Sequence, residues 1–192
     1  MSLHIALVHF PITDKLGNAV CTSITNLDLH DISRAGTTYG VDGVWLVHPY
    51  EAQQRFIKRV LRHWTEGWGA GYNPSRRESL AKTELVDDLG EVVRRIEAAE
   101  GRAPILVGTH AAQVANSVSY GALRKTLEEK PEEPVCVVFG TGWGLHPEMM
   151  LQMDLMLEPI WGPTDWNHLS VRAAIGIILD RLRGLRHPLF EQ

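Results

Sequence analysis

A glycine-rich segment late in the sequence has the residue types expected of a ligand-binding loop. The apolar run 135–139 leads directly into Gly140-Thr-Gly142-Trp-Gly144-Leu145. Glycines let the backbone approach a ligand closely at the carboxyl end of a strand, where α/β proteins bind ligands. The segment lacks the Gly-x-Gly-x-x-Gly order of a dinucleotide site and the lysine of a phosphate loop. Taken alone, the segment therefore fits a ligand loop of a different kind and an ordinary glycine turn equally well.

A second candidate loop follows about fifteen residues later. Residues 159–163 read Pro-Ile-Trp-Gly-Pro, and a helix is expected to begin near Asn167. Two prolines restrict the backbone of this segment, so its main-chain donors and acceptors would be held rigidly. Rigid main-chain groups of this kind are suited to surround a pocket.

Near the N-terminus, His30 and Arg34 stand four residues apart and would share one face of a helix that starts near Asn26. A guanidinium is a poor general base, because it does not deprotonate in proteins. Arg34 is better suited to clamp a phosphate or to stabilise a developing alkoxide. A histidine such as His30 or His168 could accept a proton, since histidine titrates near working pH.

The segment 55–77 is strongly basic although the whole chain has a net charge of −4. Its single acid is Glu66, and Trp68 and Tyr72 lie in the same stretch. Cations for phosphates beside aromatic rings for unstacked bases are typical of an RNA contact. An ordinary solvated helix face remains the alternative. The basic residues are Arg55, Lys58, Arg59, Arg62, Arg76 and Arg77.

Strands and helices alternate along the chain in the pattern that positions such loops. Apolar runs predict strands at 3–8, 43–47, 80–86, 104–108, 135–139 and 156–160, and helical spacing predicts helices at 29–39, 49–64, 92–99, 120–129 and 169–182, with a short one near 146–148. Asn26 or Asp28 is the expected cap of the first helix, and 67–74 is expected to be a loop. The alternation predicts an α/β fold, with a mostly parallel sheet covered by helices on both faces. We expect one domain over residues 1–192.

The composition excludes several classes of protein. No apolar run approaches the roughly 18 residues of a membrane span. Cys21 and Cys136 have no paired spacing, so we expect free thiols in a cytoplasmic protein and no metal site. The mildly acidic net charge argues against unselective coating of nucleic acid.

Taken in order, three segments make the chain resemble the SPOUT (trefoil-knot) RNA methyltransferases, especially a small bacterial stand-alone subfamily. They are 26–41, 135–145 and 158–176, which include Asn26, Arg34, Gly140 and Ser170. The resemblance implies a C-terminal trefoil knot, S-adenosylmethionine as cofactor, RNA (most naturally tRNA) as substrate, and a two-fold homodimer. It also implies ribose 2′-O-methylation, with Arg34, Asn26 and Ser170 in the catalytic site.

The same resemblance implies two further sets of residues. The cofactor would be enclosed by the two loops and the strand end near 107–110, that is by Gly108, Thr109, His110, Phe139, Gly140, Gly142, Trp143, Gly144, Leu145, Ile160, Trp161, Gly162, His168 and Leu169. The RNA would be contacted by His30, Arg55, Arg59, Arg62, Tyr72, Arg76 and Arg77.

The chain departs from related ribose methyltransferases at two motifs. The second motif has Gly142-Trp143-Gly144 where relatives often carry a glutamate, and the third has His168 where an asparagine is usual. Base methylation therefore stays open, as does a catalytically silent RNA-binding module that keeps the pocket. A third alternative is a different α/β enzyme that holds a nucleotide or phosphate in its glycine loops.

Overall fold

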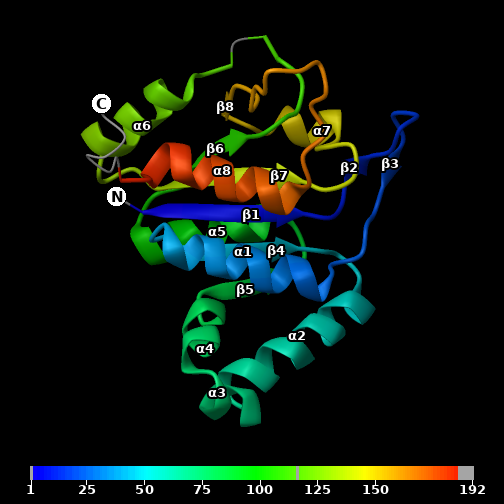
Figure 1. Ribbon diagram of the computed structural model, residues 1–192, viewed down its shortest axis with the longest axis vertical. Helices are drawn as coiled ribbons and strands as arrows, with labels where there is room; N and C mark the ends of the chain where they lie inside the picture. The colour runs from blue at the N-terminus through cyan, green and yellow to red at the C-terminus, as the bar shows by residue number, and fades with distance from the viewer. Residues whose placement is uncertain (1, 116, 186–192) are drawn as a thin grey trace.

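The computed structural model describes residues 2–115 and 117–185, and its centre is a six-stranded sheet in the order β5-β4-β1-β7-β6-β8 (Figure 1). Every pair of neighbouring strands in this sheet is parallel. The strands are β1 (Leu3–Val8), β4 (Gly43–Val47), β5 (Thr83–Val86), β6 (Ile105–Gly108), β7 (Val135–Gly140) and β8 (Leu155–Met156). A small antiparallel ribbon, β2 (Ile12–Thr13) with β3 (Ala19–Val20), extends beyond the carboxyl end of β1.

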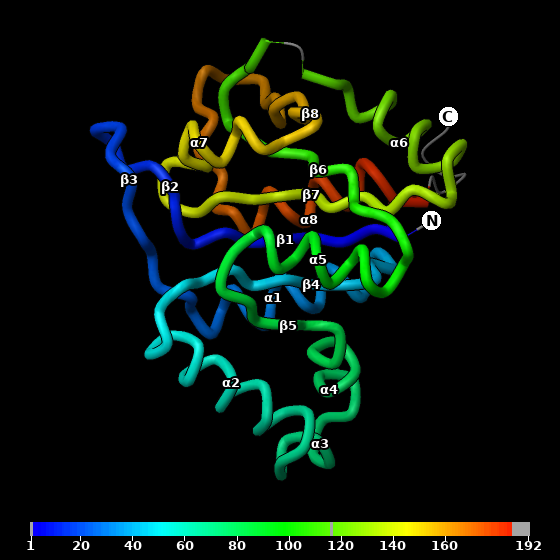
Figure 2. The backbone as a smooth tube through the Cα atoms, turned by 180° about the vertical axis from the view of Figure 1, so that it is seen from behind, coloured from blue at the N-terminus to red at the C-terminus, as the bar shows by residue number. Residues whose placement is uncertain are grey.

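Helices cover both faces of the sheet. They are α1 (Asn26–Thr38), α2 (Glu51–Thr65), α3 (Trp68–Tyr72), α4 (Pro74–Leu80), α5 (Leu89–Glu100), α6 (Tyr120–Glu129), α7 (Pro147–Met150) and α8 (Val171–Arg183). In Figure 1, α1 and α8 lie side by side in front of the sheet, and α2 to α4 extend below β5. The view from behind shows α5 across the opposite face (Figure 2). The predicted α/β architecture is therefore confirmed.

The alternation of side chains along β1 explains why both faces need cover. Ile5 and Leu7 point into a cluster with α1, α6 and α8, whereas Ala6 and Val8 point into a second cluster with α5 and α7. All six β1 residues are buried. A strand buried on both faces reads as a continuous apolar run, which is why its bounds could be predicted from the sequence.

Three local predictions were wrong. Thr25 caps α1, in a reciprocal capping box with Asp28, so the cap is neither Asn26 nor Asp28. The predicted loop 67–74 contains α3 and the start of α4, whose first residue is Pro74. The predicted strand 156–160 is replaced by the two-residue strand β8, because Glu158 donates its N–H to the carbonyl of Val118, outside the sheet, and Pro159 has no N–H to donate. The trefoil knot and the single domain stay predictions.

Candidate functional site

A pocket of about 830 Å³ opens at the carboxyl ends of β6 and β7, beside the first turns of α8. Parallel sheets commonly bind ligands at this edge. The pocket brings together predicted residues from three distant segments of the chain. They are Thr109, His110, Phe139, Gly140, Gly142, Trp143, Gly144, Ile160, His168, Leu169 and Ser170.

The loop after β7 turns so tightly that two of its positions need glycine. A Cβ atom on Gly140 would lie 2.5 Å from the backbone nitrogen of Leu145, so no side chain fits there without moving the loop. Gly144 has a φ of +105°, in the region that favours glycine. The loop backbone itself therefore forms one wall of the pocket.

The opposite wall is the segment from Glu158 to Ser170, which is attached to its surroundings by polar and aromatic contacts. The Asn167 side-chain nitrogen donates to the carbonyl of Ala111 at 2.6 Å, and the Glu158 carboxylate accepts from the backbone N–H of Tyr120 at 2.7 Å. The His168 ring lies between two tryptophan rings, 5.8 Å from Trp143 and 4.9 Å from Trp166 between centroids. These contacts hold the mouth of the pocket together across sequence-distant loops.

Four predicted pocket residues do not line it. Gly108 is buried in β6, where a Cβ atom would collide with Met156 and Met153. Leu145 is buried in the core cluster that includes α5 and α7. Trp161 and Gly162 are exposed outside the pocket, and a Cβ atom on Gly162 would meet nothing within 4 Å. Gly108 is thus required for packing, and Leu145 supplies its backbone to the turn.

Several lining residues were missed by sequence reasoning. Among them are the two acidic residues of the lining, Glu158 and Asp165. The full set is Ala111, Ala112, Tyr120, Thr141, Glu158, Pro159, Asp165, Asn167, Val171, Ala174 and Ile178. The last three follow one another at helical spacing along α8, so the periodicity of that helix could have identified them. No local signal marks Tyr120, which comes from the first turn of α6 and is 9% exposed.

A buried polar chain runs beside the pocket, at the ends of β1 and β7. His9 Nδ1 lies 3.1 Å from Thr22 Oγ1, which lies 2.5 Å from Thr141 Oγ1 in the pocket lining. His9 is fully buried, and its Nε2 has no hydrogen-bond partner among the described residues. Burial lowers the pKa of His9 to about 4, against the opposing charge of Asp28. His9 is therefore neutral at physiological pH.

Arg34 lies outside the pocket of its own chain. It lines a separate cleft of about 320 Å³ between α1 and α4, together with Asn73, Ser75 and Arg76. Arg76 stacks on Trp64, with its guanidinium carbon 4.6 Å from the ring centroid. No carboxylate within the described ranges lies within ion-pairing distance of Arg34.

His30 packs against the same group of residues, with its ring edge-on to Trp64 at 5.7 Å between centroids. The pKa of His30 is lowered mainly by burial and, to a smaller extent, by the positive charge of Arg76. Arg34 of α1 and Arg76 of α4 therefore supply the positive charge beside His30. Asn26 is exposed at the start of the helix and lines neither the pocket nor the cleft beside Arg34.

An ion pair links the first motif to the third. Arg172, in the first turn of α8, places Nη1 3.0 Å from the Asp31 carboxylate and Nε 3.6 Å from that of Asp28. Tyr39 donates to Asp180 at 3.1 Å at the other end of the same helix pair. The position of α1 relative to the pocket-lining helix α8 is thus fixed at both ends.

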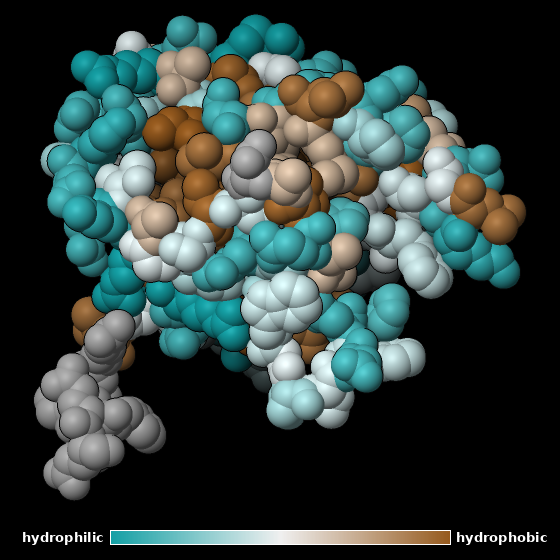
Figure 3. All heavy atoms as spheres, turned by 90° about the horizontal axis from the view of Figure 1, so that it is seen from above, coloured by the Kyte–Doolittle hydropathy of each residue, from teal (hydrophilic) through white to brown (hydrophobic). Residues whose placement is uncertain are grey.

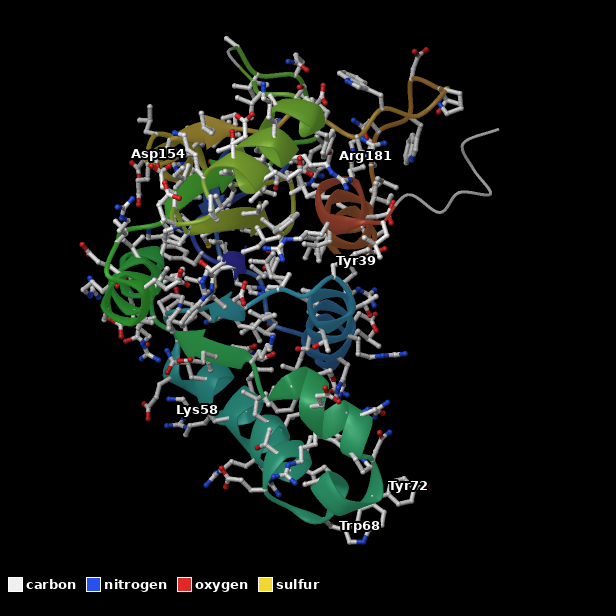
Figure 4. All side chains as sticks on the ribbon, turned by 90° about the vertical axis from the view of Figure 1, so that its left-hand side faces the viewer. Tyr39, Lys58, Trp68, Tyr72, Asp154 and Arg181 are labelled. Carbon is white, nitrogen blue, oxygen red and sulfur yellow. The ribbon has the colours of Figure 1, made fainter. Side chains whose placement is uncertain are left out.

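The remaining basic residues form a groove at the other end of the molecule. About 830 Å³ in volume, it runs between α2 and α4 and includes Arg55, Arg59, Arg62 and Arg77. Tyr72 does not join it. Its ring stacks on Trp68 at 4.6 Å, and Figure 4 shows both rings at the tip of the helical extension, away from Lys58.

Neither a metal centre nor a membrane helix is found in the part of the chain that the structure describes. Over residues 2–115 and 117–185, no group of three or more His, Cys, Asp or Glu side chains could hold a metal ion. Within the same ranges, none of the helices has the length and apolar character needed to cross a bilayer.

Comparison with known proteins gives a family match over almost the whole chain. A family model described as SAM-dependent RNA methyltransferase matches residues 2–184. An uncharacterized protein of Aquifex aeolicus is 43% identical over 181 residues, which are 94% of this chain and 88% of that protein.

A second relative has a named activity but a much longer chain. A protein of Nitratidesulfovibrio vulgaris named tRNA (guanine-N(1)-)-methyltransferase is 44% identical over 183 residues, which are 95% of this chain but only 42% of that one. Among solved structures, TrmJ from Z. mobilis ZM4 superposes with a TM-score of 0.60 at 14% identity, covering 97% of this chain and 70% of its own. The latter similarity shows a shared fold.

Proposed function

Because the chain belongs to the family of SAM-dependent RNA methyltransferases, we propose that it methylates tRNA, with a ribose 2′-hydroxyl as the acceptor. The observation that carries this proposal is the pocket at the ends of β6 and β7, which gathers the loops expected to enclose the cofactor. The name of the Nitratidesulfovibrio relative supports tRNA as the substrate.

The lining of the pocket fits S-adenosylmethionine. Its volume lies within the range of roughly 300–1,000 Å³ that is usual for small-molecule sites. Phe139, Ile160 and Leu169 offer apolar surface for an adenosine, and the backbone of the turn after Phe139 borders the same space. The carboxylates of Glu158 and Asp165 provide negative charge for a cationic cofactor. When bound, the cofactor supplies an electrophilic methyl group on a sulfonium with a good neutral leaving group.

The chain itself must orient the acceptor, exclude water and deal with one proton. Arg34 carries a permanent charge without an acidic partner, which suits it to hold a phosphate or to stabilise the acceptor oxygen as it loses its proton. His168 at the pocket mouth and His30 beside Arg34 are the side chains proposed to accept that proton. Ser170 caps α8 and faces the pocket, and we assign it to substrate positioning.

A homodimer would bring Arg34 of one protomer to the pocket of its partner. The outward face of α8 supports this arrangement, because Ala173, Gly176 and Ile177 lie on it and a Cβ atom on Gly176 would meet nothing within 4 Å. Small and apolar residues at helical spacing permit close packing of a second helix. Asn26, exposed at the start of α1, would face the same junction.

A second acceptor, the base guanine N1, is favoured by the name of the Nitratidesulfovibrio relative and by Asp165, a carboxylate in the pocket that could take the N1 proton. The name belongs to a protein of which this chain spans 42%, so the activity could reside in the remaining part.

Nucleoside analysis distinguishes the two acceptors. Unmodified tRNA is incubated with the protein and methyl-labelled S-adenosylmethionine, digested to nucleosides and analysed by mass spectrometry. We expect the label on a 2′-O-methylated nucleoside. Label on N1-methylguanosine would replace the ribose proposal with base methylation, and no label in any RNA would refute both.

A further inference from the structure

We infer that the groove between α2 and α4 is a second RNA-binding surface, which takes backbone phosphates of the tRNA away from the nucleotide that is methylated. The inference rests on the proposed function, since it concerns the same substrate. The evidence for it is that most of the arginines in the groove have no carboxylate partner among the described residues, and not simply that the arginines are numerous.

Three arginines on α5 and α6 are neutralised by carboxylates. On α5, Arg94 and Arg95 contact Glu91 at 2.8 and 2.7 Å, and on α6 Arg124 contacts Glu128 at 3.2 Å. Such pairs leave little net charge at the surface. These three arginines serve as a comparison for the arginines of the groove.

Most cations of the groove, in contrast, have no carboxylate partner within residues 2–115 and 117–185. Arg59, Arg62 and Arg77 have no carboxylate within 4.0 Å in the described structure, and Lys58 contacts only the amide oxygen of Gln54, at 3.5 Å. Arg55 is the one groove cation with a carboxylate partner, Glu51, at 2.7 Å, and Glu66 is the one acid in the lining. An uncompensated positive groove is the electrostatic footprint of a polyanion site.

The spacing of the cations also suits a phosphate backbone. Arg55, Arg59 and Arg62 follow one another at four and three residues along α2, so they form a row about 10 Å long at 1.5 Å rise per residue. Arg77 faces this row from α4. The floor is formed by less polar side chains, including Leu61, Leu80 and Ala81. A row of point charges over a neutral floor favours repeated phosphates over a single small anion.

The groove is distant from the cofactor pocket of the same protomer. It lies at the start of β5, whereas the pocket lies at the carboxyl ends of β6 and β7. β5 is three strand positions from β7, which is about 14 Å at 4.8 Å per strand. The two sites also lie toward opposite ends of the parallel strands. Figure 1 shows the extension of α2 to α4 below the sheet and β6 and β8 near the top. An RNA that reaches both sites of one protomer must therefore extend beyond the methylated nucleotide.

The test uses two triple variants with the same change in net charge. Arg59→Gln/Arg62→Gln/Arg77→Gln removes groove charges, and Arg94→Gln/Arg95→Gln/Arg124→Gln removes paired charges elsewhere. For each, the Kd for unmodified tRNA is measured by fluorescence anisotropy over a range of salt concentrations, with circular dichroism as a check of folding. The single variant Arg59→Gln serves if the triple variant does not fold.

We expect the groove variant to bind tRNA on the order of 10²-fold more weakly at low salt, with a log Kd versus log salt slope shallower by about 2 to 3, as for three lost phosphate contacts. The control variant should keep the wild-type slope within about one unit. Equal effects of the two variants would overturn the inference, as would equally tight binding of polyglutamate and tRNA by the wild type.

Kinetics separate this inference from the proposed function. The groove variant should keep its affinity for S-adenosylmethionine and its kcat at saturating tRNA, while kcat/KM falls in proportion to the lost affinity. If the wild type methylates tRNA but the groove variant has an unchanged kcat/KM, the groove inference fails alone. If the wild type binds tRNA through the groove without methylating it, the proposed function fails alone.

Discussion

At the scale of single residues, Arg34 tests the chemistry most sharply. Replacing Arg34 by alanine should lower kcat by about 10²–10³-fold, because a preorganised charge near the acceptor is lost. The Kd for S-adenosylmethionine, measured by calorimetry, should not change, because Arg34 is proposed to contact the acceptor nucleotide and it does not line the pocket of its own chain. Arg34→Lys should recover part of the rate, because it restores the charge without the planar guanidinium. A wild-type kcat in Arg34→Ala would contradict the role.

His9 predicts a pH dependence of stability. Its pKa in the folded protein is about 4, against 6.5 for the exposed side chain. Below pH 6.5 the unfolded chain binds a proton that the folded chain does not, so the free energy of unfolding falls as the pH is lowered. From pH 6.5 to 5 this contributes a loss of about 1.5 kcal/mol.

Urea unfolding of the wild type and of His9→Gln at several pH values measures this term. Glutamine cannot titrate, so the variant should lose less stability over the same interval. Burial also lowers the pKa of His30 and His48, and these residues still titrate in the variant, so its curve should be shallower but not flat. Parallel curves for the two proteins would show that His9 is not the titrating group.

At the scale of elements, the turn after β7 should be intolerant of any side chain at Gly140. Gly140→Ala puts a Cβ atom against the backbone of Leu145, so the turn must open and the pocket wall must move. We expect the affinity for S-adenosylmethionine to fall at least tenfold in a protein that remains folded. Gly162→Ala is the matched control, because that Cβ atom meets nothing within 4 Å. Equal affinities in calorimetric titrations of the two variants would contradict the role of this turn.

The elements also show which features the sequence alone could predict. The bounds of β1 and β4 followed from continuous apolar runs, and the loop after β7 could be selected as a candidate ligand loop because glycines follow a buried strand. Tyr120 and Asn167 could not be assigned, because their place in the pocket depends on how α6 and the Glu158–Ser170 segment pack in three dimensions.

The basic segment was understood only in part. Its composition predicted a polyanion surface, but the sequence could not show that Arg76 stacks on Trp64 beside α1 while Arg77 faces α2. Arg76 and Arg77 are neighbours on α4 but point in different directions. The residues predicted to form one surface are therefore divided among the cleft beside Arg34, the groove beside α2 and the stacked rings of Trp68 and Tyr72.

At the scale of the whole molecule, the proposed dimer gives a further prediction. Ile177→Glu places a charge on the outward face of α8, which should convert a dimer to a monomer in analytical ultracentrifugation and abolish methyl transfer. Ala98→Glu, on the exposed face of α5, is the control and should leave both properties unchanged. A fully active monomer would contradict a shared active site.

Mixed dimers test whether Arg34 acts across the interface. With S-adenosylmethionine held well below the Kd of the Gly140→Ala variant, both Arg34→Ala and Gly140→Ala protomers should be nearly inactive alone. If Arg34 serves the pocket of its partner, an equal mixture of the two should regain about a quarter of the wild-type activity, because half of the dimers contain one intact site. No recovery after confirmed subunit exchange would show that Arg34 acts within its own chain.

Seen from above, the end of the molecule that carries β6, β8 and α6 has hydrophobic side chains gathered in a hollow (Figure 3). The pocket that we assign to the cofactor is lined by the segments that follow β6 and β7, by Tyr120 of α6 and by the first turns of α8. The roles proposed for Arg34 on α1 and for the groove beside α2 both depend on where this pocket lies.

A crystal structure with bound S-adenosylhomocysteine, the product of the cofactor, tests the central claim most directly. We predict that its adenosine lies between the Gly140–Leu145 turn and the Glu158–Ser170 segment, in contact with Phe139 and Leu169. Density for the ligand in the cleft beside Arg34 or in the groove beside α2, with this pocket empty, would contradict the account.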